Sequence, residues 1–154
     1  MKLLKRSTLT TKLKLLFLLF IIPALMFGCT DDVDQVVPYV KVQINVDLYL
    51  PEFSSLNYSG NAIISPDAGY NGNGVIIFRL GDDFYAFDAT CPQHIETKTA
   101  ITLQNGNSGS DGQATCPYCK VTYSLYSYGT ASKGYPLKQY SVSRTGASSF
   151  NVYN

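Results

Sequence analysis

Two short stretches contain most of the residues of this chain that could bind a metal ion or react with an oxidant. Residues 91–94 read CPQH and residues 116–119 read CPYC, so they hold three of the four cysteines and the only histidine. The candidate ligands are Cys91, His94, Cys116 and Cys119, in the pattern Cys-x2-His-x21-Cys-x2-Cys. Ligands spaced in this way at a hairpin tip can point into the same space. Two facing tips would form a cage for zinc, a single iron or an iron–sulfur cluster.

The segments that would position these residues are predicted to be short β-strands. Residues 75–90, VIIFRLGDDFYAFDAT, predict two strands around a Gly-Asp-Asp turn, which is a β-hairpin that leads into CPQH. Residues 36–50 alternate between apolar and polar side chains, with Val42, Ile44 and Val46 on one face. This period of two predicts a half-buried strand.

The rest of the chain also favours short strands and turns. Residues 51–74 are expected to form loops with one short turn of helix near their start. Residues 99–118 predict a strand, a loop rich in glycine, serine and asparagine, and a second strand, while residues 121–154 predict three or four more strands. This spacing is typical of an all-β antiparallel sandwich or small barrel.

The N-terminus is predicted to be a signal peptide spanning residues 1–28. Five basic residues precede the apolar run LLFLLFIIPALMFG, which is short for a membrane-spanning helix and is interrupted by Pro23. Gly28 directly before Cys29 resembles the lipobox of bacterial lipoproteins. The resemblance implies cleavage before Cys29 and acylation of its sulfur, and several acyl chains hold a protein stably at a membrane. Ordinary cleavage with a free Cys29 thiol, or a single anchor helix, are the alternatives.

Residues 29–35 are expected to be an acidic tether. Cleavage would remove five of the 12 basic residues and none of the 11 acidic ones, so seven positive and 11 negative charges would leave a formal charge of −4. A mildly acidic domain is a poor binder of nucleic acid. The acidic cluster after Cys29 also resembles the surface-export signals of lipoproteins in the Bacteroides group. We therefore expect the protein at the bacterial cell envelope, lipid-anchored in the outer membrane and facing the periplasm or the cell surface.

Two longer segments resemble a known family. GVIIFRLGDDFYAFDATCP (74–92) resembles the strand, turn and strand that lead into the first cluster loop of a Rieske domain. CPYCKVTYSLYSYGTASKGYPLKQYSV (116–142) resembles the segment that begins at its second cluster loop. The resemblance covers residues 36–154 and extends to Rieske-like lipoproteins of the Bacteroides group. It implies a Rieske-like antiparallel β domain with two facing ligand-bearing loops. It also implies that four residues after the second loop lie in the core: Leu125, Leu137, Tyr140 and Val142.

The ligands themselves depart from the Rieske pattern, in which two cysteines bind one iron and two histidines the other. The family supplies them as Cys-x-His and Cys-x-x-His, so Cys91 and Cys116 match the two cysteines. Gln93 stands in place of the first histidine, with His94 one position later, and Cys119 stands in place of the second. A standard two-histidine centre is therefore excluded. A Cys3His [2Fe–2S] centre would need His94 to turn inward, and its extra thiolate would lower its reduction potential.

Because the protein is expected in the oxidising cell envelope, a disulfide or a zinc site are alternatives to an iron–sulfur cluster. Exported Rieske domains tend to use the twin-arginine route, and this signal has no twin arginine. In an oxidising envelope a disulfide between Cys91 and Cys116, or between Cys116 and Cys119, would leave one thiol over. Three thiolates and a histidine are also an ordinary zinc ligand set. We expect Cys91 and Cys116 to be the closest pair, and favour an inward-pointing His94 over one turned away from crowded sulfurs.

Two functions follow from these alternatives. The first is an electron carrier with a [2Fe–2S] cluster or another metal and an unknown redox protein partner. The second is a binding or structural module that kept the fold without a cluster, either disulfide-bonded or zinc-bound. The sequence gives no sign of an enzyme, because the single histidine already belongs to the candidate ligand set. Asp82, Asp83 and Asp88 are expected to be solvated turn residues or a cap for a tyrosine rather than catalytic acids.

Overall fold

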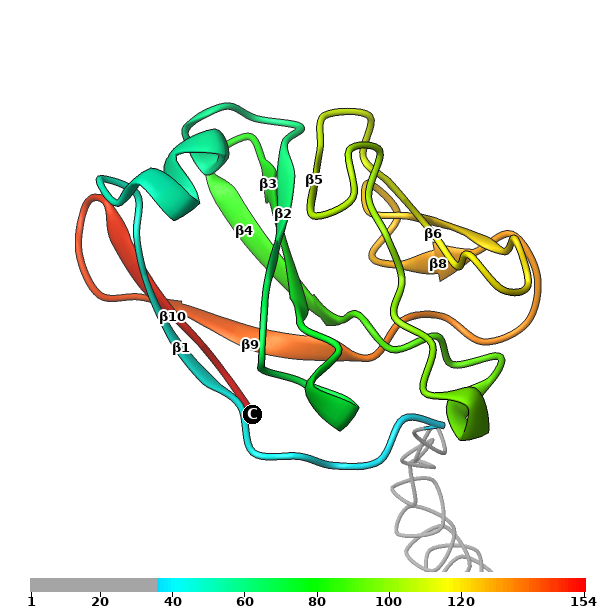
Figure 1. Cartoon of the computed structure of the whole chain (residues 1–154). Coiled ribbons are helices and arrows are strands. Elements are labelled where there is room, and N and C mark those ends of the chain that lie inside the picture. Colours follow the sequence, from blue (N-terminus) through cyan, green and yellow to red (C-terminus); the bar gives the residue numbers. More distant parts are fainter. Residues whose placement is uncertain (1–35) are drawn as a thin grey trace, which may run out of the picture. The chain divides into compact units, whose positions relative to one another are not determined.

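Antiparallel strands make up most of the regular structure of residues 36–154, which are the residues that this computed structural model describes (Figure 1). The predicted signal peptide (1–28) and the tether with its lipidation site Cys29 (29–35) lie outside this range and stay predictions. Among residues 36–154, no helix is both long and apolar enough to cross a membrane.

Seven strands form one antiparallel sheet in the order β1-β10-β9-β4-β3-β2-β5. The first and last strands of the domain pair at one edge, where Val46 lies opposite Phe150. The predicted hairpin is the pair of β3 and β4, joined by a turn in which Gly81 has φ +61°. In sheet order the strands are β1 (Gln43–Asp47), β10 (Ser149–Tyr153), β9 (Gln139–Arg144), β4 (Asp83–Asp88), β3 (Val75–Leu80), β2 (Ala62–Ser65) and β5 (Ser108–Gly109).

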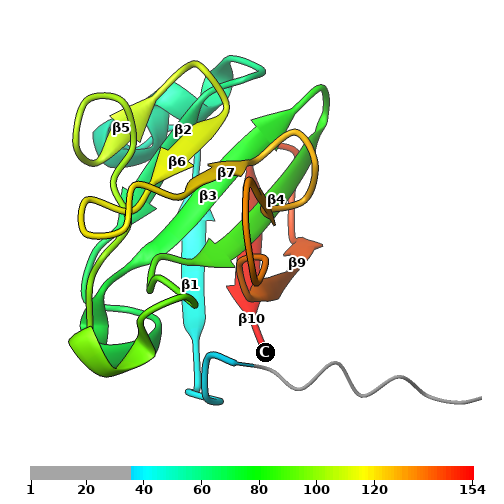
Figure 2. The ribbon, with the colours of Figure 1, turned by 90° about the vertical axis from the view of Figure 1, so that its right-hand side faces the viewer.

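A second sheet of three short strands packs on one face of the large sheet, in front of β3 and β4 in Figure 2. Its antiparallel strands are β6 (Gln113–Thr115), β7 (Thr122–Ser124) and β8 (Thr130–Ala131). Three short 3-10 helices complete the described structure: η2 (Pro51–Asn57), η3 (Tyr70–Gly72) and η4 (Ile95–Thr97). The predicted all-β antiparallel class is confirmed.

Strand β3 is buried on both faces because two hydrophobic clusters cover the large sheet. Ile76 and Phe78 face the smaller sheet and share a cluster with Tyr123. Val75 and Ile77 face the other way, into a cluster that includes Phe53 of η2 and side chains of β1 and β10. The site strands are thus held between two layers of packed side chains, and the hydrophobic effect fixes their positions.

The predicted core and strands agree with this arrangement at most positions. Leu125, Leu137 and Tyr140 are buried, whereas Val142 is only half-buried. The expected alternation in residues 36–50 is present, and η2 is the expected short helix. Strand β2 is not predicted by the sequence, because AIIS is too short to show a period of two and its pairing with β3 and β5 is decided by tertiary contacts.

A buried carboxylate anchors the end of β4 directly before the first cysteine stretch. Asp88 accepts hydrogen bonds from the Tyr140 hydroxyl at 2.5 Å and from the backbone N–H groups of Tyr70 and Thr90, both at 2.7 Å. These three donors satisfy a group that would otherwise be costly to bury. Asp88 therefore acts as the expected tyrosine cap, while Asp82 and Asp83 are exposed in the turn.

Candidate metal centre

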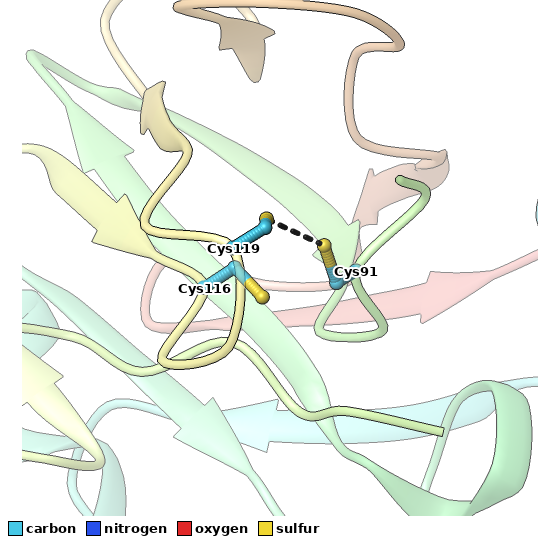
Figure 3. Close-up of side chains that lie close together, drawn as sticks. All are labelled: Cys91, Cys116 and Cys119. Carbon is cyan, nitrogen blue, oxygen red and sulfur yellow. Dashed lines mark hydrogen bonds between the residues drawn. The ribbon is translucent and has the colours of Figure 1, made fainter. Parts of the chain in front are cut away.

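The two cysteine stretches form loops that backbone hydrogen bonds close tightly. The first follows β4, and the Cys91 N–H donates to the carbonyl of Thr99 at 3.0 Å. The second joins β6 to β7, and the Cys116 N–H donates to the carbonyl of Val121 at 3.0 Å. Lys120 supports the second loop with a left-handed backbone, φ +61°. The two loops face each other, as expected (Figure 3).

Three sulfurs converge where the loops meet. The Sγ atoms of Cys91, Cys116 and Cys119 all lie within 4.8 Å of one another, and all three are free thiols. The contact in hydrogen-bonding range joins Cys91 to Cys119 at 3.8 Å, across the gap between the loops (Figure 3). Cys91 and Cys116, the pair expected to be closest, also lie within this 4.8 Å. Cys91 and Cys116 are completely buried, so Cys119 is the thiol with access to solvent.

His94 does not join the three sulfurs in the structure. Its ring stands edge-on to the exposed ring of Tyr118, with centroids 4.9 Å apart, and its Nδ1 lies 3.8 Å from Glu96 Oε1. Of the two expected arrangements, the described loops therefore show the crowded sulfurs with His94 turned away, but without a disulfide.

Gln93 has a role that sequence reasoning missed. Its Nε2 donates to the carbonyl of Tyr135 at 2.7 Å, and its Oε1 accepts from the N–H of Tyr135 at 3.2 Å. Nε2 also lies 3.5 Å from the hydroxyl of Tyr123, whose oxygen is 3.4 Å from the Cys91 sulfur. Gly134 makes room for this amide, because a Cβ there would come within 2.0 Å of Gln93 Oε1. The sequence signal for this contact is the Gly-Tyr-Pro turn (134–136) before β9, where glycine leaves room for a neighbouring side chain.

Hydrogen-bond donors surround the two buried sulfurs. Burial raises the pKa of the Cys91 thiol to about 11, and donation from Tyr123 and from the backbone N–H of Gln93 offsets this only in part. Burial acts on Cys116 as well, but the backbone N–H of Cys119, the Cys91 thiol, the backbone N–H of Tyr118 and the Cys119 thiol together outweigh it, so the pKa of Cys116 lies below its ordinary value. Burial also raises the pKa of Tyr123, which keeps its hydroxyl protonated as a donor. Of the two buried thiols, Cys116 therefore ionises before Cys91.

The three sulfurs fit around one metal ion. Around a tetrahedral ion with metal–sulfur bonds of about 2.3 Å, neighbouring sulfurs are about 3.8 Å apart. The separation of Cys91 and Cys119 has this value. A two-iron cluster with its ligands assigned as in the Rieske pattern does not fit the same arrangement. The family pattern would put Cys91 on one iron and Cys119 on the other, at opposite ends of the cluster, and His94 is not placed to complete the second iron.

The comparisons with known proteins reach only distant structures. No family model matches the chain, and no curated protein matches it. A crystal structure assigned as the NADH-dependent nitrite reductase small subunit of Mycobacterium tuberculosis is 14% identical, with 75% of this chain and 97% of that chain covered and a TM-score of 0.42. The ferredoxin of carbazole 1,9a-dioxygenase from Nocardioides aromaticivorans is 16% identical, with 74% and 97% covered and a TM-score of 0.44. Such distant likenesses assign no function, which has to come from the side chains of the site.

Proposed function

We propose that this protein is a metal-binding lipoprotein of the bacterial cell envelope that holds one metal ion through Cys91, Cys116 and Cys119. The observation that carries the proposal is the convergence of three free thiols, from two loops, to within 4.8 Å of one another. Thiolates are the ligands that zinc, iron and copper(I) prefer.

The surroundings of the sulfurs favour binding over simple packing. Buried cysteines often behave as small hydrophobic side chains, which need no polar neighbours. Here the backbone N–H groups of Cys119 and Tyr118 lower the pKa of Cys116 against the effect of burial. The Tyr123 hydroxyl, 3.4 Å from the Cys91 sulfur, offsets part of the rise that burial causes in the pKa of Cys91. Donors of this kind stabilise the thiolate form, which is the form that binds metals.

Electron transfer is the role that the resemblance of the cysteine loops implies, and it depends on the identity of the metal. With iron bound, a thiolate centre exchanges one electron with a redox protein partner. With zinc bound, which has no redox chemistry, the site would be structural. We therefore propose metal binding as the function and make the identity of the metal the first measurement.

The test is metal analysis of the full chain, purified without oxygen from its native envelope. We expect one equivalent of metal per chain and no acid-labile sulfide. The triple variant Cys91→Ser, Cys116→Ser and Cys119→Ser should lose the metal, while the matched variant Cys29→Ser should keep it. Metal-free protein that also fails to take up iron, zinc or copper(I) anaerobically would overturn the proposal.

The proposed anchoring is tested by the same Cys29→Ser variant. We expect it to be found in the soluble fraction or to be mislocalised, because acyl chains would supply the affinity for the membrane. Fractionation and metabolic labelling with a fatty acid measure this. If the variant is as firmly bound and as strongly labelled as the wild-type protein, the lipid attachment at Cys29 is wrong, whatever the metal analysis shows.

A further inference from the structure

The number and chemistry of the ligands select the ion that this centre would hold. Resting on the proposed function, we infer that the site is a three-coordinate thiolate site for a single copper(I) ion. The number of ligands, the separation of the sulfurs, the softness of the ligands and the charge around them favour this ion.

The ligand count is three in the described loops. The group of potential ligands that converges there contains Cys91, Cys116 and Cys119 and includes no histidine or carboxylate. His94 is turned to Tyr118 and Glu96. The amide of Gln93, the next polar group along the loop, is held at both ends by the backbone of Tyr135.

The sulfur separations suit a trigonal site. Three sulfurs at about 2.3 Å from an ion in their plane are about 4.0 Å apart. The pair at 3.8 Å lies close to both the trigonal and the tetrahedral separation, and the whole set lies within 4.8 Å, so small shifts of the side chains would complete the triangle. The number of ligands, and not this distance, separates the two geometries. Zinc in structural sites is almost always four-coordinate and would need a further ligand, such as water or a rotated His94.

The ligand chemistry points the same way. Soft thiolates select copper(I), zinc and iron–sulfur clusters among the common metals. Of these, copper(I) is the one that three thiolates alone satisfy, because its single positive charge needs fewer anionic ligands than the double charge of zinc. On binding, three S–H bonds are replaced by three copper–sulfur bonds, and the three protons pass to solvent without any change in oxidation state.

The environment can accept the resulting charge. Three thiolates and one copper(I) ion carry a formal charge of −2, which N–H and O–H donors must offset if two of the sulfurs are buried. The hydroxyl of Tyr123, 3.4 Å from the Cys91 sulfur, supplies one such donor. The backbone N–H groups of Gln93, Tyr118 and Cys119 also favour the charged form of the two buried thiols. The burial of Cys91 and Cys116 also keeps water and oxygen away from most of the ion. Cys119, which is partly exposed, is the side from which the ion would enter.

The experiment is an anaerobic titration of the full chain, in the Cys29→Ser background so that this thiol does not contribute. Copper(I) is supplied as its acetonitrile complex against a chromogenic copper(I) chelator, and zinc is titrated separately against a zinc indicator. We expect one copper(I) per chain and three sulfur neighbours, without nitrogen, by X-ray absorption. His94→Ala should leave the copper(I) affinity within about twofold. Cys119→Ser should weaken it by more than about 100-fold, beyond the loss caused by changing an outer-sphere group.

The possible results separate this inference from the proposed function. A nitrogen neighbour to copper, or a large loss of affinity in His94→Ala, would overturn the three-thiolate site but leave metal binding intact. If the protein prefers zinc, or if the native protein holds two irons with labile sulfide, the copper(I) inference is wrong, but metal binding by the cysteines stands. Failure to bind any of these metals would remove both. Since His94→Ala alters a partly exposed side chain, it remains informative even if Cys119→Ser does not fold.

Discussion

Gln93 and Tyr135, which are 42 positions apart, hydrogen-bond each other through both ends of the Gln93 amide, at 2.7 and 3.2 Å. The same amide nitrogen approaches the Tyr123 hydroxyl, which is therefore free to donate its own hydrogen to the Cys91 sulfur. One side chain thus connects the turn before β9 to the first cysteine loop and to the sulfur site.

Gln93→Ala should destabilise the protein and open the site. It removes the two hydrogen bonds to Tyr135 and leaves a backbone N–H and carbonyl without partners, which costs about 1–3 kcal/mol if they stay shielded from water. We expect a lower urea midpoint and faster alkylation of the cysteines in the metal-free protein. Gln104→Ala, at an exposed glutamine, is the control and should change stability by no more than about 0.5 kcal/mol. Equal alkylation rates in Gln93→Ala and the wild-type protein would contradict a role for this contact.

Gly134→Ala should be more harmful than alanine at a glycine with the same backbone and open surroundings. Gly134 has φ +82°, and its new Cβ would collide with Gln93 Oε1, whereas Gly106 has φ +79° and a Cβ added there would meet no atom within 4 Å. Both substitutions carry the left-handed backbone cost of about 1–2 kcal/mol. Only Gly134→Ala should lose additional stability, and this excess should vanish in the Gln93→Ala background. The double-mutant cycle compares the unfolding free energies, measured in denaturant, of the wild-type protein, Gly134→Ala, Gln93→Ala and the double variant. Equal losses of stability in Gly134→Ala and Gly106→Ala would contradict the prediction.

Leu137→Ala should cost about 2–5 kcal/mol, because it truncates a leucine buried between the sheets. Leu137 is 5% exposed, while Leu50, the matched control, is 45% exposed. Leu50→Ala should therefore lie within about 0.5 kcal/mol of the wild-type protein. The measurement is the free energy of unfolding in urea. An unchanged midpoint for Leu137→Ala would mean that the segment before β9 does not pack as described.

Tyr140→Phe should reduce the loss of stability at high pH. Burial and the hydrogen bond to Asp88 raise the pKa of Tyr140 above its usual 10.0 in the folded protein. The folded state therefore holds this proton more tightly than the unfolded state. The resulting stability is full below pH 10 and is lost as the pH rises towards the folded-state value. Unfolding free energies at pH 8 and pH 11 should differ less in the variant, although Tyr123 still contributes to the difference.

Tyr140→Phe is compared with a substitution at an exposed tyrosine, and it is also expected to lower the stability of the protein. Tyr58→Phe, at a side chain that is 72% exposed, should keep the wild-type dependence on pH. At pH 8, Tyr140→Phe should itself lose about 1–3 kcal/mol, because Asp88 keeps only its two backbone donors. The same slope with pH in Tyr140→Phe and wild-type protein would show that this hydroxyl does not stay protonated in the folded state.

The sequence by itself determined the features that depend on neighbours along the chain. A period of two and a Gly-Asp-Asp turn predict β1 and the β3–β4 hairpin, since strand faces and turn conformations are local properties. The cysteine spacing predicts two loops with sulfurs, and the single histidine excludes a standard Rieske centre. The burial of Leu125 and Leu137 is implied by the resemblance to the Rieske family and is confirmed.

Only the tertiary structure decided which of these groups meet. That Cys91 contacts Cys119, that His94 turns to Tyr118, and that Gln93 binds Tyr135 depend on how loops 24 to 42 positions apart are brought together. Strand β2 belongs to the same class, because four residues carry too weak a local signal and its neighbours β3 and β5 supply the pairing. Packing of two sheets fixes such distances to fractions of an ångström, and no pattern along the chain encodes them.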